Sequence, residues 1–180
     1  MKKILSTFVL LLIALTSISA SAQSSKVVGT WVGGKQPIPG YNADMVPVYV
    51  FSNGGTGAVA IGVSFNNFPI DETMSLNVEM ILSAPLTWSY SNASVSYNID
   101  LDECNLEVSD LSINTSNYQL KQTFESIKPQ MIEMLTNEFR QSIVSSIPSY
   151  GRLTNIKFSG NKMYANDGSN GPRMTFTRSK

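Results

Sequence analysis

Apolar and polar residues alternate along much of this chain, and the alternation predicts β-strands. Between residues 74 and 82 every second side chain is apolar, and most of the side chains between them are polar. The same pattern recurs over residues 86–90 and 93–101. Because successive side chains of a strand point to opposite faces of its sheet, each stretch is predicted to be a half-buried strand with one apolar face.

Turn-forming sequences separate these stretches at short intervals. Asn53-Gly54-Gly55 lies between two apolar runs, and Asn-Gly supplies the positive φ angles that a tight hairpin needs. Similar sequences occur at residues 159–161 and 167–171. Many short strands joined by such turns predict a mostly β domain, which is either an antiparallel sandwich or an up-and-down barrel of about eight strands.

One segment follows a different period. Between Leu120 and Ile147 the apolar residues recur every three or four positions, which predicts an amphipathic helix over residues 119–147, before the final hairpin. Pro129 lies inside this segment and lacks an N–H group, so we expect a kink or a break there. Pro148 and Gly151 mark the exit from the helix.

The first residues have the features of a signal peptide. Two lysines precede an apolar stretch, and Ala20-Ser21-Ala22 is an A-x-A cleavage sequence, so residues 1–22 are predicted to be removed on export to the periplasm or the exterior. A membrane anchor, the alternative, needs roughly 20 apolar residues, and serines interrupt this stretch earlier. Residues 23–180 then form a single domain without a membrane span.

The charge of the domain argues against two classes of partner. Removing Lys2 and Lys3 leaves 11 of the 13 basic residues against 13 acidic residues, which is a net charge of −2. Charged residues are only 14% of the chain, and there is no basic run. A nucleic-acid partner and an anionic membrane surface are therefore not expected.

The chain contains no histidine. This absence removes the usual general base of serine and cysteine hydrolases and the commonest ligand of zinc, copper and non-haem iron. No phosphate-binding loop, dinucleotide fingerprint or Cys-x-x-Cys motif occurs either. We therefore expect a protein that is not an enzyme, with no catalytic residues, no metal and no cofactor.

Carboxylates leave one enzymatic alternative open. Asp71, Glu72, Asp100, Asp102 and Glu103 could supply a Ca²⁺ site or an acid pair of the glycosidase type if they converged in one cleft. The alternation around Asp100 is also what the solvated face of a strand end would show.

Cys104 is the only cysteine, so an intramolecular disulfide is excluded. It shares the strand parity of Leu106 and Val108. A small buried hydrophobic residue is therefore expected there in preference to a reactive thiol.

The ends of the domain carry a recognisable pattern. Gly29-Thr30-Trp31 stands near its start and Arg178 near its end. A Gly-x-Trp on the first strand with a basic residue ending the last strand resembles the lipocalins and related calycins, particularly the small lipocalin-like domains that bacteria export. The resemblance implies a β-barrel closed at one end by Arg178 packed across Trp31, with Gly29, Trp31 and Arg178 as structural closure residues.

The parity of the last strand agrees with this pairing. Arg178 shares a face with Met174 and Phe176, so it is expected on the apolar side of the sheet. Stacking on an indole would give the guanidinium a cation–π contact of about 0.5 to 2 kcal/mol.

Two hypotheses for function follow from the apolar strand faces, which carry Tyr49, Met80, Trp88, Tyr90 and Tyr97. A barrel of about eight strands either fills itself or leaves room for one small ligand. In the first hypothesis these five residues line a site for a small, largely apolar ligand. In the second the core is filled and the protein acts by protein–protein interaction or inhibition, through the helix or residues 37–47.

Overall fold

The computed structural model describes residues 25–179, so the expected signal sequence, residues 1–22, lies outside the described residues. The described part is mostly β, with one helix between the seventh and eighth strands. The elements are β1 (Gly29–Gly33), β2 (Gln36–Pro37), β3 (Ala43–Phe51), β4 (Thr56–Pro69), β5 (Ser75–Ser91), β6 (Ser94–Ile99), β7 (Asn105–Asn114), α2 (Tyr118–Ser146), β8 (Tyr150–Ser159), β9 (Lys162–Asp167) and β10 (Arg173–Arg178).

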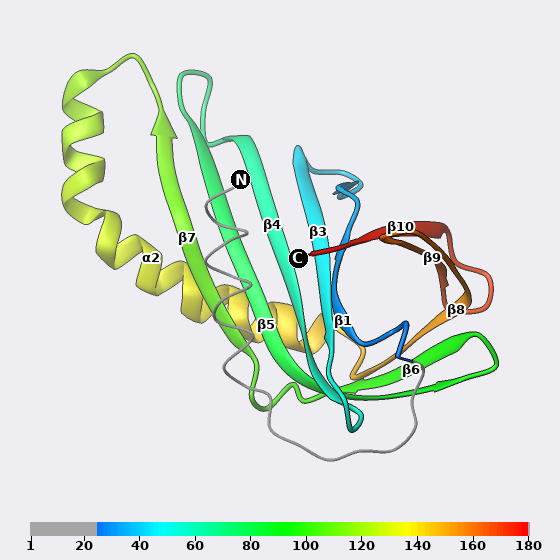
Figure 1. Cartoon of the computed structure of the whole chain (residues 1–180). Helices are drawn as coiled ribbons and strands as arrows, with labels where there is room; N and C mark the ends of the chain where they lie inside the picture. Colours follow the sequence, from blue (N-terminus) through cyan, green and yellow to red (C-terminus); the bar gives the residue numbers. More distant parts are fainter. Residues whose placement is uncertain (1–24, 180) are drawn as a thin grey trace.

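Eight of the strands form a closed antiparallel barrel in the order β1-β10-β9-β8-β6-β5-β4-β3. Strand β1 closes the ring, because Trp31 lies opposite Arg178 of β10 and opposite Tyr49 of β3. Figure 1 shows the ring of strands nearly end-on, with long parts of β4 and β5 extending away from it beside β7. The up-and-down barrel with a long inserted helix, expected from the sequence, is confirmed.

Strand β5 belongs to both the barrel and the extension. The stretches 74–82 and 86–90, expected as separate strands, are one strand of 17 residues. Its first half pairs with β7 and its second half with β6. Between the halves stands Pro85, which has no N–H for a ladder and whose carbonyl accepts a hydrogen bond from Asp100 N (2.9 Å). On the same side of β5 as β6 and β7, the loop of residues 100–104 separates these two strands opposite Pro85.

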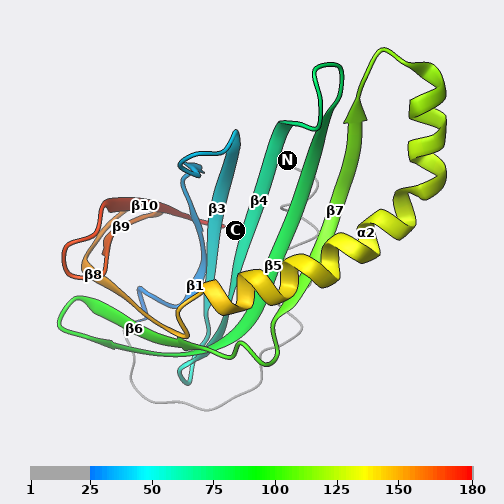
Figure 2. The same cartoon turned by 180° about the vertical axis from the view of Figure 1, so that it is seen from behind.

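Helix α2 begins at a side-chain cap. The Asn117 Oδ1 atom accepts hydrogen bonds from the backbone N–H groups of Gln119 (3.0 Å) and Leu120 (3.2 Å), as an N-cap residue does. Pro129 lies inside a helix that is assigned without a break, and the helix axis changes direction along its length (Figures 1 and 2). Three strands follow the helix, and β9 and β10 form the final hairpin.

The main core lies on the inner face of the sheet. Alternate residues of β5 from Leu76 to Tyr90 all belong to this cluster, so one apolar face runs from the extension into the barrel. A smaller cluster formed by Val48, Val50, Ala58 and Ala60 lies on the opposite face of β3 and β4. No helix within residues 25–179 is long and apolar enough to cross a bilayer.

Candidate functional site

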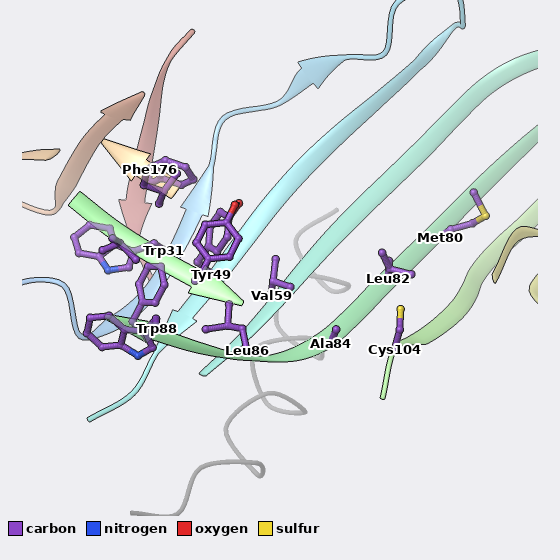
Figure 3. Close-up of a cluster of buried hydrophobic side chains, with 14 of the residues drawn as sticks. Trp31, Tyr49, Val59, Met80, Leu82, Ala84, Leu86, Trp88, Cys104 and Phe176 are labelled. Atoms are coloured by element: carbon purple, nitrogen blue, oxygen red, sulfur yellow. The ribbon is translucent and has the colours of Figure 1, made fainter. Parts of the chain in front are cut away.

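Aromatic side chains pack against one another in the interior of the barrel. Tyr49 stacks on Phe51, with ring centroids 5.7 Å apart, and lies edge-on to Phe176 at 5.8 Å. Phe51 in turn contacts Trp88, with centroids 5.0 Å apart. Figure 3 shows Tyr49, Trp88 and Phe176 gathered at the barrel end of the inner face. These contacts fill space that a small ligand would need.

Two tyrosines form a hydrogen bond within the interior of the barrel. The hydroxyl groups of Tyr49 and Tyr97 lie 3.1 Å apart, and one donates a hydrogen bond to the other. Burial raises the pKa of Tyr49 well above its usual value, and Tyr97 and Asp167 raise it further. Burial is also the main cause that raises the pKa of Tyr97. Both phenols are therefore neutral hydrogen-bonding groups near neutral pH.

A glycine makes room for Tyr97. Gly151 lies directly opposite it on β8, and a Cβ atom at Gly151 would lie 2.2 Å from the Tyr97 hydroxyl oxygen. Any side chain at this position would force Tyr97 to move. The tyrosine pair thus depends on a residue without a Cβ atom in the neighbouring strand.

Side chains of the first and last strands of the barrel contact each other and the segment before β1. The Arg178 guanidinium carbon lies 4.7 Å from the centre of the Trp31 ring, and Arg178 Nη2 donates a hydrogen bond to the Lys26 carbonyl (2.6 Å). Trp31 Nε1 donates to the Val27 carbonyl (2.7 Å). Gly29 has a φ of 137°, a conformation that residues with a side chain rarely adopt. This backbone conformation explains why the first position of the Gly-x-Trp motif is a glycine.

A cavity lies outside this packed interior. It is a cleft of about 450 Å³ between the inner face of the extended sheet and the second half of α2. Figure 2 shows this part of the helix crossing the strands at an angle on its way to the barrel. Strand β5 contributes alternate residues from Leu76 to Leu82, and α2 contributes Leu135, Phe139 and Ser142.

One end of the cleft is open and aromatic. Tyr41 and Phe68 line it and are exposed, and both make edge-to-face contacts with Phe65, at centroid distances of 6.3 Å. The other end is aliphatic, with Ile61, Leu82 and Ile147 in its lining. The cleft therefore has an accessible aromatic mouth and an aliphatic inner end next to the barrel.

A bulge places both phenylalanines on the cleft side. Residues three apart on a regular strand face opposite ways, but the pairing of β4 with β5 shifts between Phe65 and Phe68. Asn67, inside the bulge, has a φ of 50°, which asparagine tolerates better than most residues. Its backbone N–H donates a hydrogen bond to the side-chain oxygen of Asn77 (2.8 Å). Phe68 consequently joins the face of Leu76, with which it is paired.

The polarity of the lining limits its chemistry. Among the described residues that line the cleft, Tyr41 and Ser142 have polar side chains, and none is an acid or a strong base. Such a surface can take up apolar groups by removing them from water. It offers no pair of groups that could transfer protons to and from a substrate.

The residues expected to line a ligand site are divided between two places. Met80 lines the cleft, whereas Tyr49, Trp88 and Tyr97 are buried in the barrel and Tyr90 is half-buried against its core. The Trp88 indole N–H is directed at the carbonyls of Ser52 (3.1 Å) and Thr56 (2.9 Å).

Several cleft residues were not singled out from the sequence. Leu76, Leu82, Leu135 and Phe139 could have been found, because they continue the same alternation and helical period. Phe68 could not, because its side depends on the bulge.

The carboxylates do not converge. Asp71 caps the β4–β5 turn by accepting a hydrogen bond from Thr73 N (2.7 Å), and this contact and that of the Thr73 hydroxyl lower its pKa. Asp100 accepts hydrogen bonds from Asp102 N (3.2 Å) and Glu103 N (3.4 Å) in the β6–β7 loop. These turns lie at sites about ten residues apart along β5, or about 33 Å. Within residues 25–179 no cluster of three or more potential metal ligands occurs.

Cys104 is buried at the start of β7, as its parity suggested. Burial raises the pKa of its thiol, and the nearby Arg140 lowers it to a smaller extent. Figure 3 shows the side chain beside Leu82 and Ala84 on the same inner face. A buried thiol with a raised pKa is a poor nucleophile.

No family model matches the chain, and no curated protein matches it.

Proposed function

We propose that this protein is an exported, lipocalin-like binding protein that holds a small, largely apolar ligand in the cleft without transforming it. The observation that carries the proposal is the cleft of about 450 Å³ with its apolar lining. Sites for small molecules commonly have volumes of about 300 to 1,000 Å³ and mainly apolar walls. Transfer of an apolar ligand from water to such walls is favourable by about 25 cal/mol per Å².

The shape of the cleft supports a binding role over a purely structural one. Tyr41 and Phe68 keep large apolar surfaces in water at the mouth, and a bound ligand would cover part of them. At the inner end Leu82 is buried. The mouth is therefore an accessible part of the cleft.

The export and family parts of the proposal rest on other features. Residues 1–22 have the composition of a signal peptide, and their removal would leave Gln23 as the first residue. The contact of Trp31 with Arg178 has the form that the lipocalin resemblance implies. Mass measurement of the protein recovered from outside the cytoplasm tests the export, since it distinguishes a chain beginning at Gln23 from the full chain.

The ligand is tested by native mass spectrometry of the mature protein purified from its own host, followed by denaturing extraction. We expect a stoichiometric apolar compound that is released on unfolding and returns on refolding with the extract. The extract is chemically unchanged after prolonged incubation with the protein. A clean apoprotein that also takes up no neutral apolar dye, such as N-phenylnaphthylamine, contradicts the proposal.

A protein-binding role is a second candidate, favoured by the outer surface of α2. Leu120, Ile127 and Met134 are exposed, and their seven-residue spacing aligns them along one side of the helix. Exposed apolar stripes of this kind bind partner proteins. Replacing all three residues by glutamine, with pull-down from the host's extracytoplasmic fraction, tests this role independently, because none of the three lines the cleft.

A further inference from the structure

A second, much smaller cavity adjoins the inner end of the cleft. It has a volume of about 10 Å³, room for no more than one water molecule, and Cys104, Ala84 and Ile99 are among its walls. Ile61, Leu82 and Ile147 line this cavity and also line the cleft. The three side chains therefore form a partition between the cleft and the space nearest the barrel.

Within the partition, Ile147 comes from the helical side, and its backbone is fixed from both directions. Helix α2 ends at Ser146, and Pro148 disfavours helical angles at the residue before it. Two residues further on, the Ser149 carbonyl accepts a hydrogen bond from Ile99 N (2.6 Å), and β8 begins at once. The side chain of Ile147 is thus anchored at the partition by local structure that a ligand would not easily displace.

The dimensions of the cleft indicate the shape of its occupant. Leu76 and Leu82 both line it and lie six residues apart on β5, a distance of about 20 Å at about 3.3 Å per residue. An extended hydrocarbon chain suits a cleft of this length with an apolar lining. A length of about 20 Å corresponds to about sixteen carbons in extended form.

The order of residue types along the cleft gives the chain a direction. Tyr41 and Phe68 stand at the exposed mouth, and near them a backbone–side-chain network joins Asn67 to Asn77. The inner end presents the aliphatic side chains of the partition. A molecule with one polar end is therefore best placed with its tail inward and its polar end at the mouth.

We propose that the cleft takes a single unbranched hydrocarbon chain, tail first, and that Ile147 is the specificity-determining residue that sets its maximal length. The proposal rests on the binding function proposed above. It adds the class of ligand and the residue that limits the length of the bound chain. The tail ends against Ile147, and the space beyond, toward Cys104, is closed to it by this side chain. Chains longer than the cleft must leave methylene groups in water at the mouth.

The test measures affinity as a function of chain length. The mature protein is titrated with straight-chain fatty acids and their methyl esters, from decanoic to eicosanoic, by displacement of N-phenylnaphthylamine. For the wild type we expect about fourfold tighter binding for each added methylene until the tail reaches the partition, and no gain beyond that length. Acids and esters of equal length bind within about threefold of each other, because none of the described residues that line the cleft is charged.

A smaller and a larger side chain at position 147 are expected to change the optimal chain length of the ligand in opposite directions. Ile147→Ala removes three carbons and joins the two cavities, so the optimum moves to chains about two methylenes longer. Ile147→Phe fills more of the inner end and moves the optimum to shorter chains. Leu135→Ala is the matched control, because it truncates a cleft residue about 18 Å away along the chain direction of α2 and lowers affinity without moving the optimum.

Cys104 reports the position of the tail directly. It lines the small cavity, so the longer chain bound to Ile147→Ala slows its reaction with methyl methanethiosulfonate, whereas the same chain has no such effect on the wild type. An unchanged optimum in both Ile147 variants, each folded by near-UV circular dichroism, overturns the role of Ile147 but leaves the binding function. Tighter binding of a sterol than of any chain overturns the ligand class. Failure of every apolar compound to bind overturns the function itself.

Discussion

The guanidinium of Arg178 lies over the face of Trp31, with its carbon 4.7 Å from the ring centre, and joins the last strand of the barrel to the first. Both side chains also hold the chain that precedes β1, because Arg178 donates to the Lys26 carbonyl and Trp31 to the Val27 carbonyl. Trp31 is almost completely buried. One contact therefore combines ring closure with the anchoring of the segment that enters the barrel.

Arg178→Ala is expected to lower the free energy of unfolding by about 1 to 3 kcal/mol, through loss of the cation–π contact and of a charged hydrogen bond. Arg178→Lys recovers only part of the loss, since an ammonium cannot stack as a planar guanidinium does. Urea unfolding followed by tryptophan fluorescence measures both. Arg173→Ala is the control on the same strand: Arg173 lies over the Tyr164 ring at 5.4 Å but is exposed, so a change of about 0.5 kcal/mol is expected. Equal losses in both variants would contradict a special role for Arg178.

Phe68→Ala is expected to weaken the binding of N-phenylnaphthylamine about fivefold to thirtyfold, because an aromatic wall is lost at the mouth of the cleft. Ile70→Ala provides the comparison: both side chains belong to the region of the β4–β5 turn and are similarly exposed, 45% for Phe68 and 51% for Ile70, but Ile70 does not line the cleft. Fluorescence titration of the two variants with the dye makes the measurement. A similar weakening in both would place the dye elsewhere.

Asn67→Val is expected to abolish the bulge of β4, because a β-branched residue strongly resists a φ of 50°. Phe68 then turns to the other face of the strand, and dye affinity falls as far as in Phe68→Ala, with a loss of about 1 to 2 kcal/mol in stability. Asn67→Gly keeps the backbone conformation and retains the affinity. Normal binding by a folded Asn67→Val protein would show that the bulge does not position Phe68.

The tyrosine pair makes the stability of the barrel sensitive to alkaline pH. Burial raises the pKa of both Tyr49 and Tyr97 in the folded protein, so above pH of about 10 the unfolded chain releases protons that the folded protein keeps. The contribution of the two buried tyrosines to the free energy of unfolding is therefore fully present below that pH. It is lost as the pH rises further.

The double variant Tyr49→Phe/Tyr97→Phe is expected to lose less stability than the wild type between pH of about 9 and 11. Near pH 7 the change is small, because both partners of one hydrogen bond are removed together. The free energy of unfolding is measured with denaturant at a series of pH values. Parallel curves of this free energy against pH for the double variant and the wild type would contradict the prediction.

The barrel could be predicted because its signals are local. Alternation over residues 74–101 and the Asn53-Gly54 turn each report strand and hairpin geometry within a few residues. The helix was equally visible, since its period is that of an amphipathic helix and Pro148 ends it. The position of Arg178 on the apolar face of the last strand also followed from parity alone.

The site could not be predicted in the same way, because its position depends on which strands are neighbours. Met80 and Trp88 lie on one uninterrupted face of β5, yet one lines the cleft and the other is packed in the barrel. The difference arises at Pro85, where the partner of β5 changes from β7 to β6. Phe68 faces the cleft only through the shifted register at Asn67. Alternation of apolar and polar residues indicates which side chains share a face of a strand. It carries no information on the change of strand partner at Pro85 or on the register shift at Asn67.

The closure of the ring has a consequence for the order in which the protein can fold. Strand β1 pairs with β10, and β10 follows every other strand in the chain, so the final seam cannot form until the last strand has left the ribosome or any translocation channel. Until then Trp31 lacks its stacking partner and β1 has an unpaired edge. Contacts between the two extremes of a domain carry a large loop-closure cost, so we expect completion of this seam to be a late and slow event of folding.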